Sequence, residues 1–249
     1  MPTPFYHLSI AEEILTWADM PGSVSSWLEE YQAEFLFGNT APDVQTLSGQ
    51  DRRATHFFDL PISPNQRTAW ARMLEEQPFL AEVDRLPAGQ AAFIAGYLCH
   101  LLADWKWVLE IFAPIFGPNV TWSHQRHRSY LHNVLRSHLD LTLRPGLNPQ
   151  IAGQLSAARP NGWLSFVRDQ DLVDWRDYLA GQLCTGCEAQ TVEVFAARQG
   201  ISPDDFYRLL NSEDELQKQI FSRLPRQRLQ TYRQQLVVES VDIVKGYLN

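Results

Sequence analysis

The most distinctive local pattern that could do chemistry is His100-Leu-Leu-Ala-Asp104. Residues four apart stand on one face of a helix, so this His and Asp can hold one metal ion through a ring nitrogen and a carboxylate oxygen. The segment around them is strongly apolar, and burying an unpaired carboxylate there would be costly. A buried, hydrogen-bonded His–Asp pair would satisfy the same pattern, and these two residues alone do not decide between the two interpretations.

Three further residues of metal-ligand type lie upstream. His7 shares an apolar helical stripe, where a lone His is more often a hydrogen-bonded core residue than a ligand. Asp43 follows Pro42 in a turn-like passage, where an Asp usually caps backbone amides, and His56 could be an ordinary loop residue. Taken together with the pair above, however, these are residue types suited to zinc, spread over several elements.

The histidines are unevenly distributed. All seven fall between His7 and His138. This asymmetry places a candidate site in the first half of the chain.

Helical periodicity dominates the elements that must position these residues, and Pro and Gly fall mostly between the periodic segments. In the first half, helices are predicted at about residues 6–18, 25–37, 64–76, 89–112 and 123–143. Between about Gly38 and Leu60 we expect an irregular passage, because Gly38 can end a helix and Pro42 disfavours a restart. Segment 89–112 is apolar nearly all round, which is typical of a central buried helix.

The rest of the chain is predicted to form further amphipathic helices, so the fold class is all-α, a compact multi-helix bundle. No linker-like passage divides the sequence, which favours a single helical domain over residues 1–249. Within it, the metal-site half covers about 1–146 and a C-terminal helical extension about 147–249.

Composition excludes several classes of protein. The net charge of −8 argues against a nucleic-acid partner bound through backbone phosphates. The most apolar stretch, residues 91–102, is too short for a transmembrane segment, and the beginning of the chain has no secretory signal, so a cytoplasmic protein is expected. Cys99, Cys184 and Cys187 do not make a disulfide framework. The last two are expected to be ordinary thiols in a helix-terminal turn, and a metal or redox role is the alternative.

Several motifs occur in an order that resembles the zinc-dependent phospholipase C family over about residues 4–115. They are Pro4-Phe-Tyr-His7-Leu-Ser-Ile-Ala11, Phe37-Gly-Asn-Thr-Ala-Pro-Asp43, Thr55-His56-Phe57 and Gly96-Tyr-Leu-Cys-His100-Leu-Leu-Ala-Asp104. The resemblance implies an all-α fold with a zinc cluster at the bottom of a cleft.

In that family pattern, Asp43, His56, His100 and Asp104 would surround one zinc ion. Asp104 would bridge to a second zinc that also takes His7. Water would attack the phosphorus of a small phosphodiester or a phospholipid headgroup, and Asp43 would help to orient that water as a base.

The sequence departs from the family at the third zinc. The family takes that ion with a His soon after the His-x-x-x-Asp pair and a later His-x-x-x-Glu, whereas here Glu110 occupies the first place and no His-x-x-x-Glu follows. His124 and His127 are the predicted substitutes, with His138 a weaker one, because a helical wheel puts all three on the apolar stripe of segment 123–143 and leaves His132 off it. Alternatively, these histidines pack in the core or face solvent.

Two functional hypotheses follow. The first is a hydrolase of phosphodiester bonds, phospholipase C-like, in which two or three zinc ions activate water. The second is a non-catalytic helical protein that binds a metal or a partner through a degenerate site, and the incomplete third-zinc set motivates it.

Overall fold

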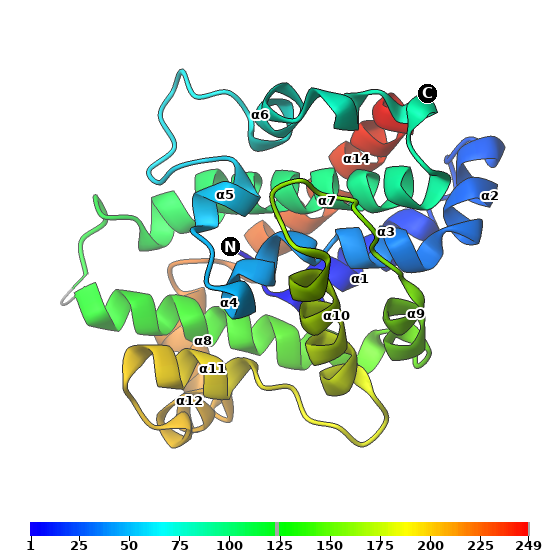
Figure 1. The fold of residues 1–249 in the computed structure, drawn as a ribbon. Coiled ribbons are helices and arrows are strands. Elements are labelled where there is room, and N and C mark those ends of the chain that lie inside the picture. Colours follow the sequence, from blue (N-terminus) through cyan, green and yellow to red (C-terminus); the bar gives the residue numbers. More distant parts are fainter. Residues whose placement is uncertain (123–124, 249) are drawn as a thin grey trace.

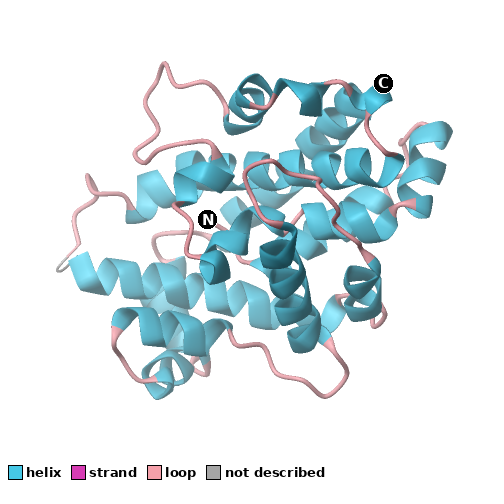
Figure 2. Ribbon diagram, viewed as in Figure 1, coloured by secondary structure: helices cyan, strands magenta, loops and turns pink. Residues whose placement is uncertain are grey.

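The computed structural model describes residues 1–122 and 125–248, and over these residues it contains helices and no strands (Figures 1 and 2). The all-α prediction is therefore confirmed. The helices that build and frame the site are α1 (Pro4–Leu15), α2 (Gly22–Glu30), α3 (Gln32–Gly38), η1 (Ala41–Val44), α4 (Gln45–Ser48), α5 (Arg52–His56), α6 (Ala69–Glu76), η2 (Pro78–Ala81), η3 (Val83–Arg85), α7 (Ala88–Trp107) and η4 (Val108–Phe116). The others are α8 (Gln125–Leu143), η5 (Arg144–Gly146), α9 (Ile151–Ala157), α10 (Asp169–Leu183), α11 (Thr191–Gln199), α12 (Pro203–Leu210), α13 (Glu213–Leu216), η6 (Gln217–Phe221) and α14 (Arg226–Leu248).

Helix α7 is the central element, as its all-round apolar sequence predicts. Nearly all of its residues are buried, and α3, α6 and α14 pack against it. It continues into the π-helical segment η4, which contains Pro114. Because α14 also contacts α1, and α10 contacts η1, the second half of the chain packs on the first (Figure 1). The single-domain organisation stays a prediction.

Two glycines bring the backbones of α3 and α7 into direct contact. A Cβ atom at Gly38 would lie 2.0 Å from the carbonyl oxygen of Phe93, and one at Gly96 would lie 2.2 Å from that of Phe35. Real Cβ atoms do not approach backbone oxygens so closely, so only glycine fits at either position.

The passage between α3 and α6 differs from the prediction. Segment 25–37 forms two helices, which separate at Tyr31, and the passage predicted to be irregular contains η1, α4 and α5. Pro42 does not prevent η1, because it occupies the first turn, where a proline's missing N–H would have no intrahelical partner in any case.

The cysteine prediction also needs a correction. Cys184 directly follows α10, as the helix-terminal position predicts, but it forms a disulfide with Cys187. Gly186 has φ +81°, in the left-handed region that favours glycine, and this lets the four-residue turn close. Cys99 is a buried free thiol.

The α3–α7 contact makes the fold sensitive to one added methyl group. We expect Gly96→Ala to lower the free energy of unfolding by about 3 kcal/mol, because the clash is with rigid backbone and not with a side chain that can move away. Urea denaturation measures the change. Gly153→Ala is the control, because a Cβ there meets nothing within 4 Å. Equal stability of the two variants would contradict the close contact.

Candidate metal centre

Five of the predicted site residues converge in the structure. They come from four elements, namely α1, η1, α5 and α7. Two overlapping groups have their ligand atoms within 4.8 Å of one another: one is His7, His100 and Asp104, and the other is Asp43, His56 and His100. Together these five residues are called the His/Asp cluster below. Because residues 97 positions apart in the sequence meet here, the cluster is a product of the tertiary fold.

The spacing of the ligand atoms is typical of groups that share an ion. His56 Nε2 lies 3.5 Å from Asp43 Oδ1 and 3.3 Å from Asp104 Oδ2, and His7 Nε2 lies 3.5 Å from Asp104 Oδ1. His100 Nε2 lies 3.9 Å from Asp104 Oδ2. Good hydrogen bonds are shorter, about 2.7–3.2 Å. Ligands that stand about 2.1 Å from a tetrahedral zinc ion are about 3.4 Å from each other.

Several of these atoms also have no other partner. His7 Nε2, His100 Nε2 and Asp104 Oδ1 are buried and make no hydrogen bond within the described residues. Buried polar atoms are nearly always paired, so three orphaned atoms in one place need an explanation. A neutral imidazole nitrogen and a carboxylate oxygen are the ligands that zinc takes, and the cluster therefore fits a zinc site.

Neighbouring groups orient two of the rings. His100 Nδ1 lies 2.8 Å from the carbonyl oxygen of Asn39, and His56 Nδ1 lies 2.9 Å from the hydroxyl of Thr55. A carbonyl can only accept, so His100 carries its proton on Nδ1 and turns the lone pair of Nε2 towards the cluster. The Thr55 hydroxyl donates to the carbonyl of Arg52, which leaves it to accept from His56 in the same way.

The sequence reasoning missed these orienting residues, although they lie inside the motif segments. Gly96, one turn before His100, allows the close approach, because a Cβ there would lie 2.9 Å from the backbone and side-chain nitrogens of Asn39. Tyr97 donates a 2.6 Å hydrogen bond to the carbonyl of Thr55, which attaches α5 to α7. The Gly96-Tyr97 pair before His100 therefore has a structural role, because Gly96 admits the neighbouring backbone and Tyr97 holds it in place.

Helix α5 ends in an unusual backbone conformation. Phe57, which follows His56 directly, has φ +60°, a left-handed conformation that is uncommon for a residue other than glycine. Its ring is buried and packs edge-on against Phe166 at 5.2 Å between centroids. This packing holds the turn that directs the chain away immediately after His56.

The carboxylates of the cluster are held in their ionised form. Burial opposes the charge on Asp104, but the neighbouring imidazoles of His56 and His7 hold its pKa well below the usual range. Arg52 adds an ion pair, with its guanidinium nitrogen 2.8 Å from Asp104 Oδ2. Burial also lowers the pKa of His100 to about 3, so this ring is neutral at pH 7, as a metal ligand must be.

Asp43 is the most accessible member of the cluster. Its side chain is 19% exposed, whereas those of His7, His56, His100 and Asp104 are at most 1% exposed. Burial opposes its ionisation, but the nearby imidazoles of His56 and His100 lower the pKa of Asp43 to about 2. Its carboxylate is therefore an ionised group at the entrance to the cluster.

Of the residues predicted to hold a third metal, those that the structure describes do not join the cluster. His124 lies outside the described residues. His127 is in neither group of potential ligands, and its ring contacts Trp122 and Tyr130. Glu110 instead forms a 2.7 Å ion pair with Lys106.

The predicted inward stripe of this helix is also wrong at one position. His132, expected off the stripe, is buried and accepts a 3.0 Å hydrogen bond from the indole of Trp107. His138 is only partly buried, against the ring of Phe221. Helix α8 turns His132 inward because the aromatic rings of η4 provide a pocket for an uncharged imidazole there, with Phe112 5.1 Å from it between centroids.

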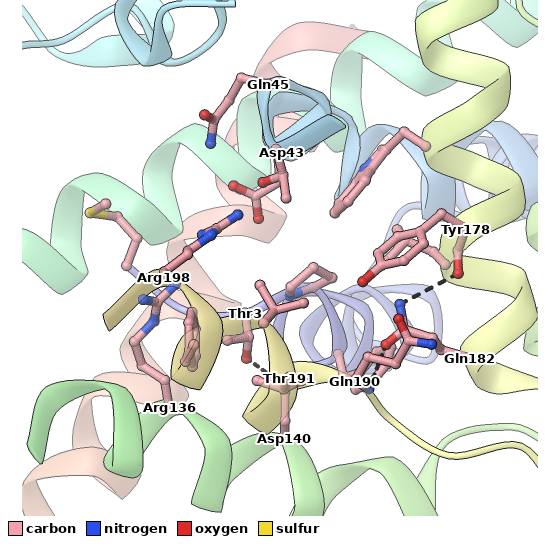
Figure 3. Close-up of a pocket in the computed structure, with 18 of the residues that line it drawn as sticks. Thr3, Asp43, Gln45, Arg136, Asp140, Tyr178, Gln182, Gln190, Thr191 and Arg198 are labelled. Carbon is pink, nitrogen blue, oxygen red and sulfur yellow. Dashed lines mark hydrogen bonds between the residues drawn. The ribbon is translucent and has the colours of Figure 1, made fainter. Parts of the chain in front are cut away.

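A pocket with a cavity of about 230 Å³ adjoins the cluster (Figure 3). Asp43 and Arg52 line it, so they connect the buried histidines to the open space. The remaining walls come from the N-terminal residues and from α4, α8, α10 and α11. In Figure 3, Arg136 and Arg198 lie on one side of the pocket and Tyr178 on the other.

The fold and site together define an all-α protein with a buried cluster of metal-ligand residues beside a pocket. Residues 6–107 match the family model described as zinc dependent phospholipase C. This segment contains all five residues of the His/Asp cluster and is similar to the zinc-dependent phospholipase C family. No curated protein and no solved structure matches the chain. Among the described residues, none of the helices has the length and apolar character needed to cross a bilayer.

Zinc should stabilise the fold through this cluster. Free zinc at about 1,000 times its Kd would add about 4 kcal/mol, because the ion binds the folded cluster and not the unfolded chain. We therefore expect chelator-treated protein to melt about 10 °C lower than zinc-loaded protein, with full recovery on adding zinc, as measured by calorimetry. His100→Ala should lose the response, whereas His138→Ala should keep it. A zinc response equal in both variants would place the ion elsewhere.

Proposed function

We propose that the protein is a zinc-dependent hydrolase of phosphodiester bonds, phospholipase C-like in its chemistry. The observation that carries this proposal is the close spacing of the nitrogens and oxygens in the His/Asp cluster, 3.3–3.9 Å apart, with His7 Nε2, His100 Nε2 and Asp104 Oδ1 buried and without a hydrogen-bond partner in the described residues. The family match over the same segment supports it. The cluster adjoins a pocket into which a small phosphodiester or a phospholipid headgroup can enter.

In this proposal Asp43, His56, His100 and Asp104 hold one zinc ion, and His7 and Asp104 hold a second. The two oxygens of Asp104 face different partners, since Oδ1 is near His7 whereas Oδ2 is near His56 and His100. One carboxylate can thus serve two ions. Bound zinc would supply positive charge that polarises a phosphoryl oxygen and acidifies water.

Two side chains of the chain itself would act on the substrate. Asp43 is ionised and partly exposed, so its carboxylate can accept a hydrogen bond from the attacking water and orient it. Arg52 lines the pocket while it contacts Asp104, and its guanidinium packs 4.4 Å from the centre of the Phe58 ring. It is therefore held where it can donate to a phosphoryl oxygen.

A non-catalytic metal-binding or interaction protein is the second candidate. It is favoured by the third-metal ligands, which do not assemble within the described residues. In that case zinc would still bind and stabilise the fold, but the zinc-loaded protein would not hydrolyse phosphodiesters. The two candidates therefore differ in activity and agree in metal content.

Asp104→Ala tests the proposed centre directly. We expect the wild-type protein to hold at least two equivalents of zinc by plasma mass spectrometry and the variant to lose them, because Asp104 contacts every histidine of the cluster. Hydrolysis of bis(p-nitrophenyl) phosphate should fall to background. Asp59→Ala removes an exposed carboxylate and is the control that keeps both properties. Zinc-loaded wild type without activity on a broad panel of phosphodiesters would favour the second candidate.

Substitution of Arg52, with the neighbouring Arg53 as the matched control, tests the proposed contact with the substrate. Arg52→Ala should lower kcat/KM by about 10- to 100-fold while zinc content is kept, because it removes a charged hydrogen bond to the phosphoryl group. Arg53→Ala should stay close to wild type, since Arg53 pairs with Glu76 and Asp59 and does not line the pocket. Equal losses in the two variants would show that Arg52 has no direct contact with the substrate.

A further inference from the structure

The pocket beside the His/Asp cluster is locally basic, although the protein is acidic. Its charged lining residues are three arginines, Arg52, Arg136 and Arg198, and two aspartates, Asp43 and Asp140. Asp43 and Arg52 face the cluster, so their charges are already engaged there. The other three residues line the pocket without being members of the cluster.

Arg136 is a cation with unused hydrogen-bonding capacity. One of its terminal nitrogens donates to Asn133, and its guanidinium lies 4.3 Å from the centre of the Phe195 ring. Its Nε is buried without a hydrogen-bond partner in the described structure. Burial lowers the pKa of Arg136 to about 10, so the side chain remains charged at neutral pH.

The nearby carboxylate of Asp140 does not satisfy Arg136. The two oxygens of Asp140 accept hydrogen bonds from the hydroxyls of Thr3 and Thr191 instead. These contacts join the segment before α1 and the start of α11 to α8. Asp140 thus serves the packing of the pocket wall and contributes only through-space attraction to the arginine.

Arg198 brings a second positive charge to the same place. It stands in the last turn of α11, is exposed, and makes neither an ion pair nor a hydrogen bond with any described residue. Its charge disfavours the cationic form of Arg136, and Figure 3 shows the two side chains on the same side of the pocket. Two guanidinium groups placed close together repel each other, and an anion bound between them removes this cost.

We propose that Arg136 and Arg198 form an anion subsite next to the metal centre. This inference rests on the proposed function and deepens it: the preferred substrate is a phosphodiester whose alcohol part carries a further phosphate or carboxylate. The scissile phosphate faces Asp43 and Arg52, and the second anion lies against Arg136 and Arg198. Phosphate and carboxylate are both oxyanions, and guanidinium groups bind either of them through paired hydrogen bonds.

The size of the pocket agrees with a headgroup and not with lipid tails. Its volume of about 230 Å³ is below the range of about 300–1,000 Å³ that is typical for drug-sized ligands. Opposite the arginines, Gln182 and Tyr178 offer neutral polar groups (Figure 3). No carboxylate of this part of the pocket is free to receive a quaternary ammonium group, because Asp140 is engaged by two hydroxyls.

Substrate selectivity tests the subsite. Four p-nitrophenyl phosphodiesters can be compared, with ethanol, choline, 2-phosphoethanol or 3-hydroxypropanoate as the second alcohol. We expect wild type to prefer the two anionic esters over the ethyl ester and to disfavour the choline ester. The 2-phosphoethanol and 3-hydroxypropanoate arms distinguish a phosphate from a carboxylate. Arg198→Ala should reduce the ratio of kcat/KM for the better anionic ester over the ethyl ester by at least about 10-fold.

A binding measurement separates this inference from the proposed activity. Inorganic phosphate is titrated calorimetrically into chelator-treated protein, so that zinc cannot contribute. Binding should weaken by about 10-fold or more in Arg198→Ala, which is safe for folding because the side chain is exposed. Arg208→Ala, an exposed arginine of the next helix that pairs with Asp205, is the control and should match wild type.

The outcomes of the two measurements are distinct. Phosphate binding that depends on Arg198, with no hydrolysis of any ester, would support the subsite and count against the proposed hydrolase. Hydrolysis without preference for the anionic esters, and phosphate binding that is equal in wild type and Arg198→Ala, would overturn the subsite and leave the hydrolase standing.

Discussion

The charge of Asp104 is the constraint on which the rest of the site depends. An ionised carboxylate in the middle of a buried, apolar helix would be prohibitively costly alone, because so little water reaches it. The structure compensates it by bringing three histidines from separate elements and the guanidinium of Arg52 around its two oxygens. The histidines approach without forming good hydrogen bonds, which is costly unless a cation completes the arrangement. Stability and the capacity to bind metal therefore have the same origin.

This arrangement requires a close contact between α3 and α7. Gly38 and Gly96 remove the side chains that would keep the two backbones apart. The contact brings the carbonyl of Asn39 to His100, and this carbonyl fixes which nitrogen of the ring faces the cluster. A glycine contact that looks like a packing feature is thus also a determinant of ligand chemistry, because tautomer and ring orientation decide whether an imidazole can bind a metal.

How much of this site the sequence can predict depends on whether the pattern that marks each residue is local in the chain or arises only in the folded structure. The His100–Asp104 pair was visible because helical spacing alone puts both residues on one face. His7, Asp43 and His56 needed the order of several motifs, since each has an ordinary local explanation. Asn39 and Thr55 were out of reach, because their role depends on where neighbouring backbone lies in three dimensions.

The wheel of segment 123–143 failed for a related reason. The helical wheel predicts the buried face from the apolar residues of this helix alone. In the structure the burial of His132 is decided by η4, whose aromatic rings surround the imidazole. The Cys184–Cys187 disulfide was likewise invisible, since the spacing permits free thiols equally well. A periodic pattern identifies a helix more securely than it identifies the face that the helix buries.

The second half of the chain contributes part of the wall of the pocket beside the His/Asp cluster. The family match ends at residue 107, yet Arg136 and Arg198 line the pocket from beyond it, and Trp175 donates a 2.8 Å hydrogen bond to the carbonyl of Thr40, close to Asp43. The matched segment thus carries the groups suited to the reaction, whereas the pocket wall that would select the substrate is built largely from the rest. A net charge of −8 says nothing about this wall, because a few arginines in a confined space set the local potential more strongly than distant surface carboxylates. Preference for an anionic substrate is therefore compatible with an acidic protein.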